Sequence, residues 1–198
     1  MIIVNKIPIE VSARHVHLSQ KDVEKLFGKG YKLTPARFLS EPRNFVCKER
    51  ITLETHSKIM EEVAIIGPTR DVSQIELSLT DCHELGIREV EVRDSGEINL
   101  AGTPGINIKY GQNKIHLDDG VVVAWRHIHM NQTEALNLNL SDGKLVKVRV
   151  IGPRAIIFEN VLIRVRADFV LGMQLDTDEA NAAGIGLSET QLFGELVG

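Results

Sequence analysis

Two short segments, far apart in the chain, carry the same pattern of residues that can do chemistry. The first reads Arg14-His15-Val16-His17 and the second reads Arg126-His127-Ile128-His129. In an extended strand, side chains two residues apart project from the same face, so both imidazoles of each pair can reach one metal ion. Neutral imidazole is a good ligand for zinc and similar divalent metals. The repeated pairs hold four of the 7 histidines and predict a two-metal site or a site assembled from paired halves.

Each histidine pair needs a further ligand, because a catalytic zinc is usually held by three protein ligands beside one open position. In the first half, Glu76 lies just upstream of a Thr-Asp pair and is a normal zinc ligand. In the second half the comparable position, within one residue, is Gln174, whose neutral amide oxygen binds zinc weakly. The residues therefore predict one complete site and one weakened site. His116, Cys82 and His83 are candidates to complete the second, although no spacing in the sequence places them there.

Arg70 is a further candidate for chemistry. It follows the turn residues 67–69 and precedes Glu76 by six positions. The planar guanidinium fork is suited to hold a phosphate or a carboxylate beside a metal with an open position. From its position alone, a surface arginine at the end of a strand is the simpler interpretation.

The elements that must position these residues are mainly short strands. Apolar alternation broken by Gly, Pro, Asn and Asp favours barrels or a sandwich over a parallel sheet with crossover helices. After each histidine pair the pattern indicates a short helix, capped by Ser19 in the first case and by Asn131, with Glu134 in a capping box, in the second. The strands we expect are 8–11, 45–54, 61–66, 74–79, 89–92, 120–124, 145–150, 155–158 and 162–165.

The resemblance between the two halves extends beyond the histidines. Residues Ile66-Gly67-Pro68 recur as Ile151-Gly152-Pro153, and the segment 79–87 resembles 176–185, each with a Thr-Asp helix entry and a terminating glycine. Four shared landmarks in the same order indicate two related, β-rich halves that arose by internal duplication.

Composition narrows the class of protein. The chain has 198 residues, of which 43% are hydrophobic and 25% charged, as in an ordinary soluble globular protein. The formal net charge of -4 argues against nucleic-acid binding, and no apolar run is long enough to span a membrane. Cys47 and Cys82 are isolated, so neither a disulfide framework nor a cysteine zinc site is expected. The opening residues 1–6 read as a strand rather than a signal peptide, and we expect cytoplasmic residence.

A set of motifs together resembles one protein family. The chain is similar to the PduL-type phosphate acyltransferases, the phosphate propanoyltransferases of bacterial acid metabolism and microcompartments. The resemblance covers nearly the whole chain in order and at family-like spacing. The motifs that carry it are 12–19, 67–70 with 74–76, 102–105, 126–130 and 176–184.

The resemblance implies both a fold and a reaction. The fold would be two related β-barrels capped by short helices, with residues 1–13 and 122–198 in the first barrel and residues 14–121 in the second. The enzymes of this family move a short acyl group between coenzyme A and inorganic phosphate, so the expected partners are acyl-CoA, phosphate and acyl phosphate. Family likeness also implies a homodimer.

Roles follow from the resemblance residue by residue. The expected cofactor is zinc, at a dinuclear site. The residues at matching motif positions are His15, His17 and Glu76 for one zinc, His127 and His129 for the other, and Arg70 for phosphate. No acyl-enzyme intermediate is required, since phosphate oriented by metal and arginine can attack the thioester directly.

Two departures from the family pattern bear on function. The family carries a histidine before the motif 176–184 that completes the second zinc site, whereas this chain has Gln174. We therefore expect that site to bind zinc less tightly. Microcompartment members also begin with an amphipathic extension, for which the sequence shows no room before the first strand, so free cytosolic residence is expected.

Three functions remain in contention. The first is an active phosphotransacylase, which predicts phosphate-dependent release of the CoA thiol. The second is a degenerate, non-catalytic relative that binds acyl-CoA, phosphate or one metal. The reason to consider it is Gln174, which stands in place of a zinc-ligand histidine. The third is a metal-dependent hydrolase of thioesters, which predicts thiol release that is indifferent to phosphate. The sequence favours them in that order and does not identify the acyl group.

Overall fold

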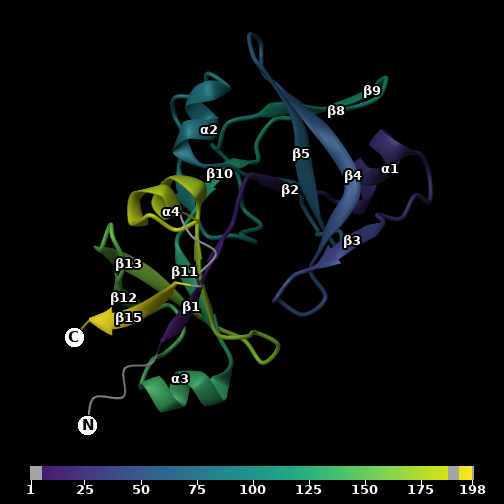
Figure 1. Cartoon of the computed structure of the whole chain (residues 1–198). Helices are drawn as coiled ribbons and strands as arrows, with labels where there is room; N and C mark the ends of the chain where they lie inside the picture. Colours follow the sequence, from purple (N-terminus) through teal and green to yellow (C-terminus); the bar gives the residue numbers. More distant parts are fainter. Residues whose placement is uncertain (1–5, 187–191, 198) are drawn as a thin grey trace. The chain divides into compact units, whose positions relative to one another are not determined.

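The computed structural model describes residues 6–186 and 192–197, and the described chain is mostly strand with short helices (Figure 1). It forms two compact units: the first combines Met1–Ala13 with Trp125–Gly198, and the second is Arg14–Ala124. The prediction of a mainly β fold in two related halves is confirmed. In the described residues, no helix has the length and apolar character needed to cross a membrane.

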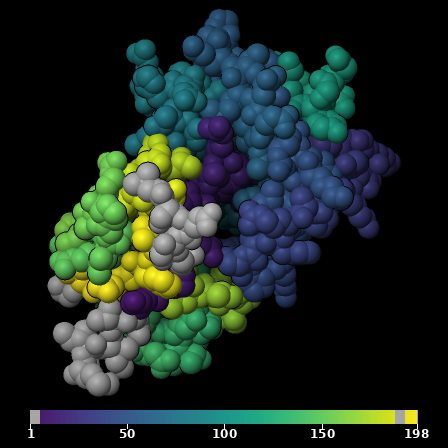
Figure 2. Space-filling model, viewed as in Figure 1, coloured from purple at the N-terminus to yellow at the C-terminus, as the bar shows by residue number. Residues whose placement is uncertain are grey.

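The first unit is built on a closed barrel whose core is formed by alternate residues of each strand. Ile128 and Met130 point inward in one strand, and Ile7 and Ile9 do so in the N-terminal strand. The purple N-terminal residues accordingly lie among the green and yellow C-terminal ones in the space-filling view (Figure 2). In barrel order, the strands are β1 (Ile7–Val11), β14 (Gly172–Leu175), β11 (His127–Met130), β13 (Ile156–Val165), β12 (Leu145–Val150) and β15 (Phe193–Val197).

The second unit contains a nine-stranded sheet, which is not closed on itself among the described residues. Its long strands β4 and β5 appear in blue in Figure 1, and its core includes Val16, Ile75 and Val121. In sheet order, the strands are β7 (Val92–Arg93), β10 (Val121–Ala124), β6 (Gln74–Glu76), β2 (His15–His17), β5 (Ile59–Gly67), β4 (Phe45–Glu54), β8 (Ile106–Tyr110) and β9 (Asn113–Leu117), with β3 (Pro35–Phe38) paired to β4.

Strand pairing is the same around the two histidine strands, as an internal duplication requires. β2 lies between antiparallel β6 and parallel β5, and β11 lies between antiparallel β14 and parallel β13. The next strand along is β10 beside β6 and β1 beside β14, both parallel. Thus β1, which precedes β2 in the chain, lies in the sheet of β11, and β10, which precedes β11, lies in the sheet of β2. Because β10 pairs with β6 and β7, residues 122–124 belong to the second unit, whereas the sequence-based boundary placed them in the first.

Four short helices follow the strands that carry candidate site residues: α1 (Gln20–Phe27), α2 (Leu79–Glu84), α3 (Gln132–Leu138) and α4 (Thr177–Ala183). Ser19 caps α1 and Asn131 caps α3 with Glu134 in a capping box, as predicted. Ser78 caps α2 and Asp176 caps α4, each with a capping box. When Ser78 is aligned with Asp176, the alignment of the two repeats differs by one residue from the alignment based on their Thr-Asp pairs.

The arginine of each repeated motif ties its histidine strand to a helix. Arg14 Nη1 lies 2.5 Å from Asp81 Oδ1, and Arg126 Nη1 lies 2.6 Å from Glu179 Oε1. Asp81 and Glu179 each occupy the third position of their helix and complete its capping box. The two arginines therefore connect to equivalent places, which gives the Arg-His-x-His pattern a structural reason for its first residue.

Several expected strands differ in extent from the observed ones. The segments 155–158 and 162–165 are one strand, β13, because the chain passes through Asn160 at a φ of 53° without leaving the barrel. The segment 74–79 ends at Glu76, since Ser78 already caps α2. The segment 89–92 reduces to Val92–Arg93. The hairpin β8–β9 was not among the expected strands, although Ile106, Ile108 and Tyr110 alternate with polar residues along β8.

Candidate metal centre

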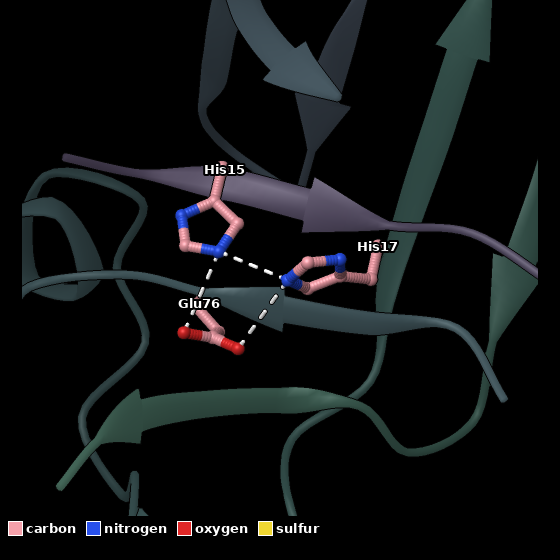
Figure 3. Close-up of side chains that lie close together, drawn as sticks. All are labelled: His15, His17 and Glu76. Atoms are coloured by element: carbon pink, nitrogen blue, oxygen red, sulfur yellow. Dashed lines mark hydrogen bonds and ion pairs between the residues drawn. The ribbon is translucent and has the colours of Figure 1, made fainter. Parts of the chain in front are cut away.

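Three buried side chains from two neighbouring strands form one cluster in the second unit (Figure 3). Val16 points into the core, so His15 and His17 of β2 project together from the opposite face. Glu76 of β6 stands directly opposite His15 and projects from that same face. All three residues are at most 5% exposed. Of the described residues, they are the one group of three such side chains whose ligand atoms lie within 4.8 Å of one another.

The distances within this cluster fit a tetrahedral zinc site. The Nε2 atoms of His15 and His17 are 3.2 Å apart. The carboxylate oxygens of Glu76 lie 3.5 Å from His15 Nε2 and 3.7 Å from His17 Nε2. Bond lengths of about 2.0–2.2 Å to zinc place two tetrahedral ligands about 3.4 Å apart. Two imidazole nitrogens and one carboxylate are also the donors that zinc prefers.

Hydrogen bonding and burial keep His17 in the form that binds metals. Its Nδ1 lies 3.1 Å from the Ile66 carbonyl oxygen, which can only accept, so Nδ1 carries the proton and the Nε2 lone pair faces the cluster. Burial lowers the pKa of His17 well below its usual value of 6.5, and the neighbouring charges of His15 and Arg70 lower it further. The imidazole is therefore neutral at physiological pH.

Arg70 is held beside this cluster rather than on a distant surface. Its backbone N–H donates to the Leu18 carbonyl at 3.0 Å, and its Nη1 lies 3.1 Å from Gln74 Oε1 and 3.7 Å from Glu76 Oε1. The Arg70 side chain is 29% exposed, so it remains accessible to solvent while its backbone is held by Leu18. The structure therefore does not support the simpler interpretation of Arg70 as a surface arginine at the end of a strand.

Two residues at the cluster were missed by reasoning from the sequence. The Ser95 hydroxyl donates to Glu76 Oε1 at 2.6 Å, and the Gly96 backbone N–H donates to Gln74 Oε1 at 3.0 Å. Two donors at one oxygen settle the orientation of the Gln74 amide. The buried Nε2 of Gln74 has no hydrogen-bond partner within the part of the chain that the structure describes. The one sequence signal for Gln74 was its place two residues before Glu76 on the same face.

The second histidine pair has a different neighbourhood, in the first unit. His127 and His129 are buried on β11, with their ring centroids 4.4 Å apart, and the His129 ring lies 4.0 Å from the Phe169 ring, centroid to centroid, in a tilted arrangement. His127 Nδ1 lies 2.6 Å from the Trp125 carbonyl oxygen, which assigns the proton to Nδ1 as in His17. Gln174 stands opposite His127 just as Glu76 stands opposite His15. The repeat analysis therefore identified the equivalent position correctly.

The alternatives named for completing the second pair have other surroundings. His116 is exposed and lies beside Asn107 and Asp118 on the β8–β9 hairpin. Cys82 is buried in the core of the second unit, and His83 is exposed near the end of α2. None of the three is in the barrel that holds the second pair. Both cysteines are buried, and they are not joined in a disulfide.

Comparison with known proteins finds relatives that match nearly the whole chain. A family profile described as phosphate propanoyltransferase matches residues 8–186, which include both histidine pairs. The chain belongs to the phosphate propanoyltransferase family. It is 49% identical over 176 residues to a phosphate propanoyltransferase of Leptotrichia buccalis, with 89% of this chain and 82% of the relative covered. The same coverage holds for a 48% identical phosphate propanoyltransferase of Sebaldella termitidis. A phosphate propanoyltransferase of Thermotoga maritima is 49% identical over 177 residues, with 88% and 82% covered. The protein is accordingly an acyltransferase enzyme.

Proposed function

We propose that the enzyme transfers a short acyl group between coenzyme A and inorganic phosphate, with zinc held by His15, His17 and Glu76. The observation that supports this most is the buried cluster of these three side chains, with the Arg70 guanidinium 3.7 Å from the carboxylate of Glu76. His127 and His129 would hold a second zinc in the other unit. Family membership agrees with the reaction class, since the relatives carry the name phosphate propanoyltransferase.

In the proposed reaction, each bond that forms is matched by one that breaks. A phosphate oxygen forms a bond to the thioester carbonyl carbon, the carbon–sulfur bond breaks, and the CoA thiolate leaves and takes a proton from solvent. The products are acyl phosphate and free CoA thiol. Bound zinc supplies a Lewis acid that stabilises negative charge on oxygen.

The chain's own residues have separate tasks in this proposal. Arg70 binds the phosphate, because its planar fork offers several N–H donors to two oxygens of one anion. Gln74 orients that fork through its oxygen, which Gly96 in turn holds in place. Ser95 donates to Glu76 and positions the carboxylate toward the two imidazoles. Burial excludes water from the carboxylate and strengthens each of these contacts.

The test is release of the CoA thiol from propanoyl-CoA and acetyl-CoA by zinc-loaded protein, with and without phosphate. We expect phosphate-dependent release, and a loss of about a hundredfold in kcat/KM for phosphate in Arg70→Gln, comparable to removal of one strong donor to a reacting oxygen. Arg88→Gln is the matched control, since Arg88 is an exposed arginine of the same unit, and it should leave the kinetics unchanged.

Two results would overturn the proposed reaction. Thiol release at the same rate without phosphate would identify a thioester hydrolase. No release from either thioester, together with retained binding of acyl-CoA, would identify a non-catalytic relative. His127→Ala extends the test to the second pair, since release should fall in that variant if the pair takes part.

A further inference from the structure

The helix that follows the first histidine pair begins differently from the other three described helices. In α2, α3 and α4, the acid at the third helical position accepts from the backbone N–H of the capping residue, which closes a capping box. In α1 the corresponding acid is Asp22, but the Ser19 N–H donates instead to Ser73 Oγ at 2.9 Å. Ser73 lies 54 positions farther along the chain, on the segment that carries Arg70. The start of α1 therefore includes a residue of that segment.

Two serine hydroxyls and one carboxylate make the connection. Ser73 Oγ donates to Asp22 Oδ2 at 2.8 Å, and Ser19 Oγ donates to the same oxygen at 2.9 Å. Each hydroxyl gives its one hydrogen to Asp22 and accepts from a backbone N–H, Ser73 from that of Ser19 and Ser19 from that of Asp22. The other carboxylate oxygen accepts from Lys25 Nζ at 3.0 Å. Ser19, Asp22 and Ser73 are at most 9% exposed, so burial limits competition from water for these bonds.

The segment that carries Arg70 is also joined to the end of the histidine strand. The Arg70 N–H donates to the Leu18 carbonyl at 3.0 Å, and Arg70 forms an isolated parallel bridge with Ser19. Ser73 directly precedes Gln74, whose Oε1 accepts from Arg70 Nη1 at 3.1 Å. Residues 70–73 are thus fixed at both ends, and the residue that orients the guanidinium comes directly after the second fixed point.

The helix itself does not need Ser73 for its cap. In α2 the same two residue types, Ser78 and Asp81, close the capping box directly, because the Ser78 N–H donates to Asp81 Oδ2 at 3.2 Å. Ser19 and Asp22 carry the groups for the same closure. The link through Ser73 therefore adds little that α1 lacks, and its consequence is the attachment of residues 70–73 to the start of the helix.

We propose that Ser73 and Asp22 are positioning residues for Arg70: they hold residues 70–73 against the start of α1, so that the guanidinium is in place before phosphate binds. This inference rests on the proposed function, because it assumes that Arg70 binds phosphate. A side chain that must be ordered during binding lowers the affinity, whereas one that is already held does not. The network should therefore act on phosphate binding and leave the zinc ligands unchanged.

The test is steady-state kinetics of zinc-loaded protein at varied phosphate. Ser73→Ala should raise KM for phosphate about tenfold, less than the loss expected when Arg70 itself is replaced, and should change kcat by less than about twofold. Zinc content should match the wild type. The melting temperature should also stay close to that of the wild type, because Asp22 can then close the capping box on Ser19 as in α2. Ser57→Ala is the matched control, since Ser57 is an exposed serine of the same unit, and it should leave KM unchanged.

A double-mutant cycle separates the positioning of Arg70 from a general loosening of the fold. In the Arg70→Gln background, Ser73→Ala should have no further effect on kcat/KM for phosphate, because the side chain that it positions is gone. Asp22→Asn is a second variant, since it keeps the size of the side chain and an oxygen that accepts from Ser73. It removes the charge that strengthens this hydrogen bond, so KM for phosphate should rise by a smaller factor, and again only where Arg70 is present.

Failure of this inference is distinguishable from failure of the proposed function. An unchanged KM for phosphate in both Ser73→Ala and Asp22→Asn would overturn the positioning role, while phosphate-dependent thiol release still supported the enzyme. An equal loss of kcat/KM from Ser73→Ala with and without Arg70 would likewise overturn it, since the residue would then act by another route. Thiol release from the zinc-loaded wild type that ignores phosphate, or kinetics unaffected by Arg70→Gln, would instead overturn the proposed function.

Discussion

Replacement of Glu76 by glutamine tests the first metal site with a change of one functional group. Glu76 is 5% exposed, and its carboxylate faces two imidazoles, the Ser95 hydroxyl and the Arg70 guanidinium. Glutamine keeps the shape and an oxygen that accepts from Ser95, but it removes the negative charge that a divalent cation needs. The effect on stability should therefore depend on whether zinc is present.

The size of the effect follows from linkage between binding and folding. A metal at a thousandfold excess over its dissociation constant stabilises the folded state by about 4.1 kcal/mol. If Glu76→Gln weakens binding a hundredfold, about 2.7 kcal/mol of that stabilisation is lost. For a chain of 198 residues, this corresponds to a melting temperature about 5–11 °C lower in the presence of zinc.

Without zinc the same change should have little effect. Removal of a buried charge offsets the lost attraction to Arg70, and the Ser95 hydrogen bond is kept, so we expect a difference of less than about 1.5 kcal/mol. The assay is a thermal melt of wild type and Glu76→Gln, each with excess chelator and with excess zinc. Glu61→Gln is the control, because Glu61 is exposed on β5 of the same unit. An equal zinc-dependent rise in melting temperature for wild type and Glu76→Gln would refute the assignment of Glu76 as a ligand.

Three further predictions address the surroundings of the site. Burial alone would raise the pKa of Asp22, but hydrogen bonds from Ser73 and neighbouring groups outweigh it and lower the pKa below 3.8. Asp22→Ala should therefore lower the free energy of unfolding by about 1–3 kcal/mol at neutral pH. In urea melts at decreasing pH, this difference between wild type and variant should shrink once the pH falls below about 3.8, as the native carboxylate protonates. A constant difference down to pH 2 would contradict this. Gln74→Leu should raise KM for phosphate more than it lowers kcat, because it frees Arg70 without removing it, and steady-state kinetics at varied phosphate would show an unchanged KM if the contact were irrelevant. Burial first, and then the nearby charge of Glu49, raise the pKa of the Cys47 thiol to about 12, so alkylation at pH 8 should require denaturant; rapid modification of the native protein, followed by mass spectrometry, would be the contrary result.

Local pattern predicted much of this protein. The alternation around Val16 and Ile128 put both imidazoles of each pair on one face, and the structure agrees. Ser19 and Asn131 are caps as expected, since a capping side chain bonds to a backbone N–H only three residues away. These features depend on residues close together in the chain.

The strand boundaries were predicted less well where two signals competed. Leu79 continues the apolar pattern of β6, but Ser78 already begins a helix through its hydrogen bond to Asp81. In β13, Asn160 resembles a turn residue, yet pairing with β12 on both sides of it keeps the chain in one strand. Tertiary pairing overrides local preference in such cases, because the energy of a strand lies mostly in its contacts with its neighbours.

The sequence by itself determined the kinds of ligand, the face from which each pair projects, the duplication, and the equivalence of Gln174 with Glu76. Only the tertiary structure decided which side chains stand beside them. Ser95 reaches Glu76 from a loop, and Glu10 meets Gln174 across two strands that are far apart in the chain. The reason is physical: spacing along one strand is set by backbone geometry, whereas the neighbour across a sheet is set by pairing and register, which emerge from the packing of the whole unit.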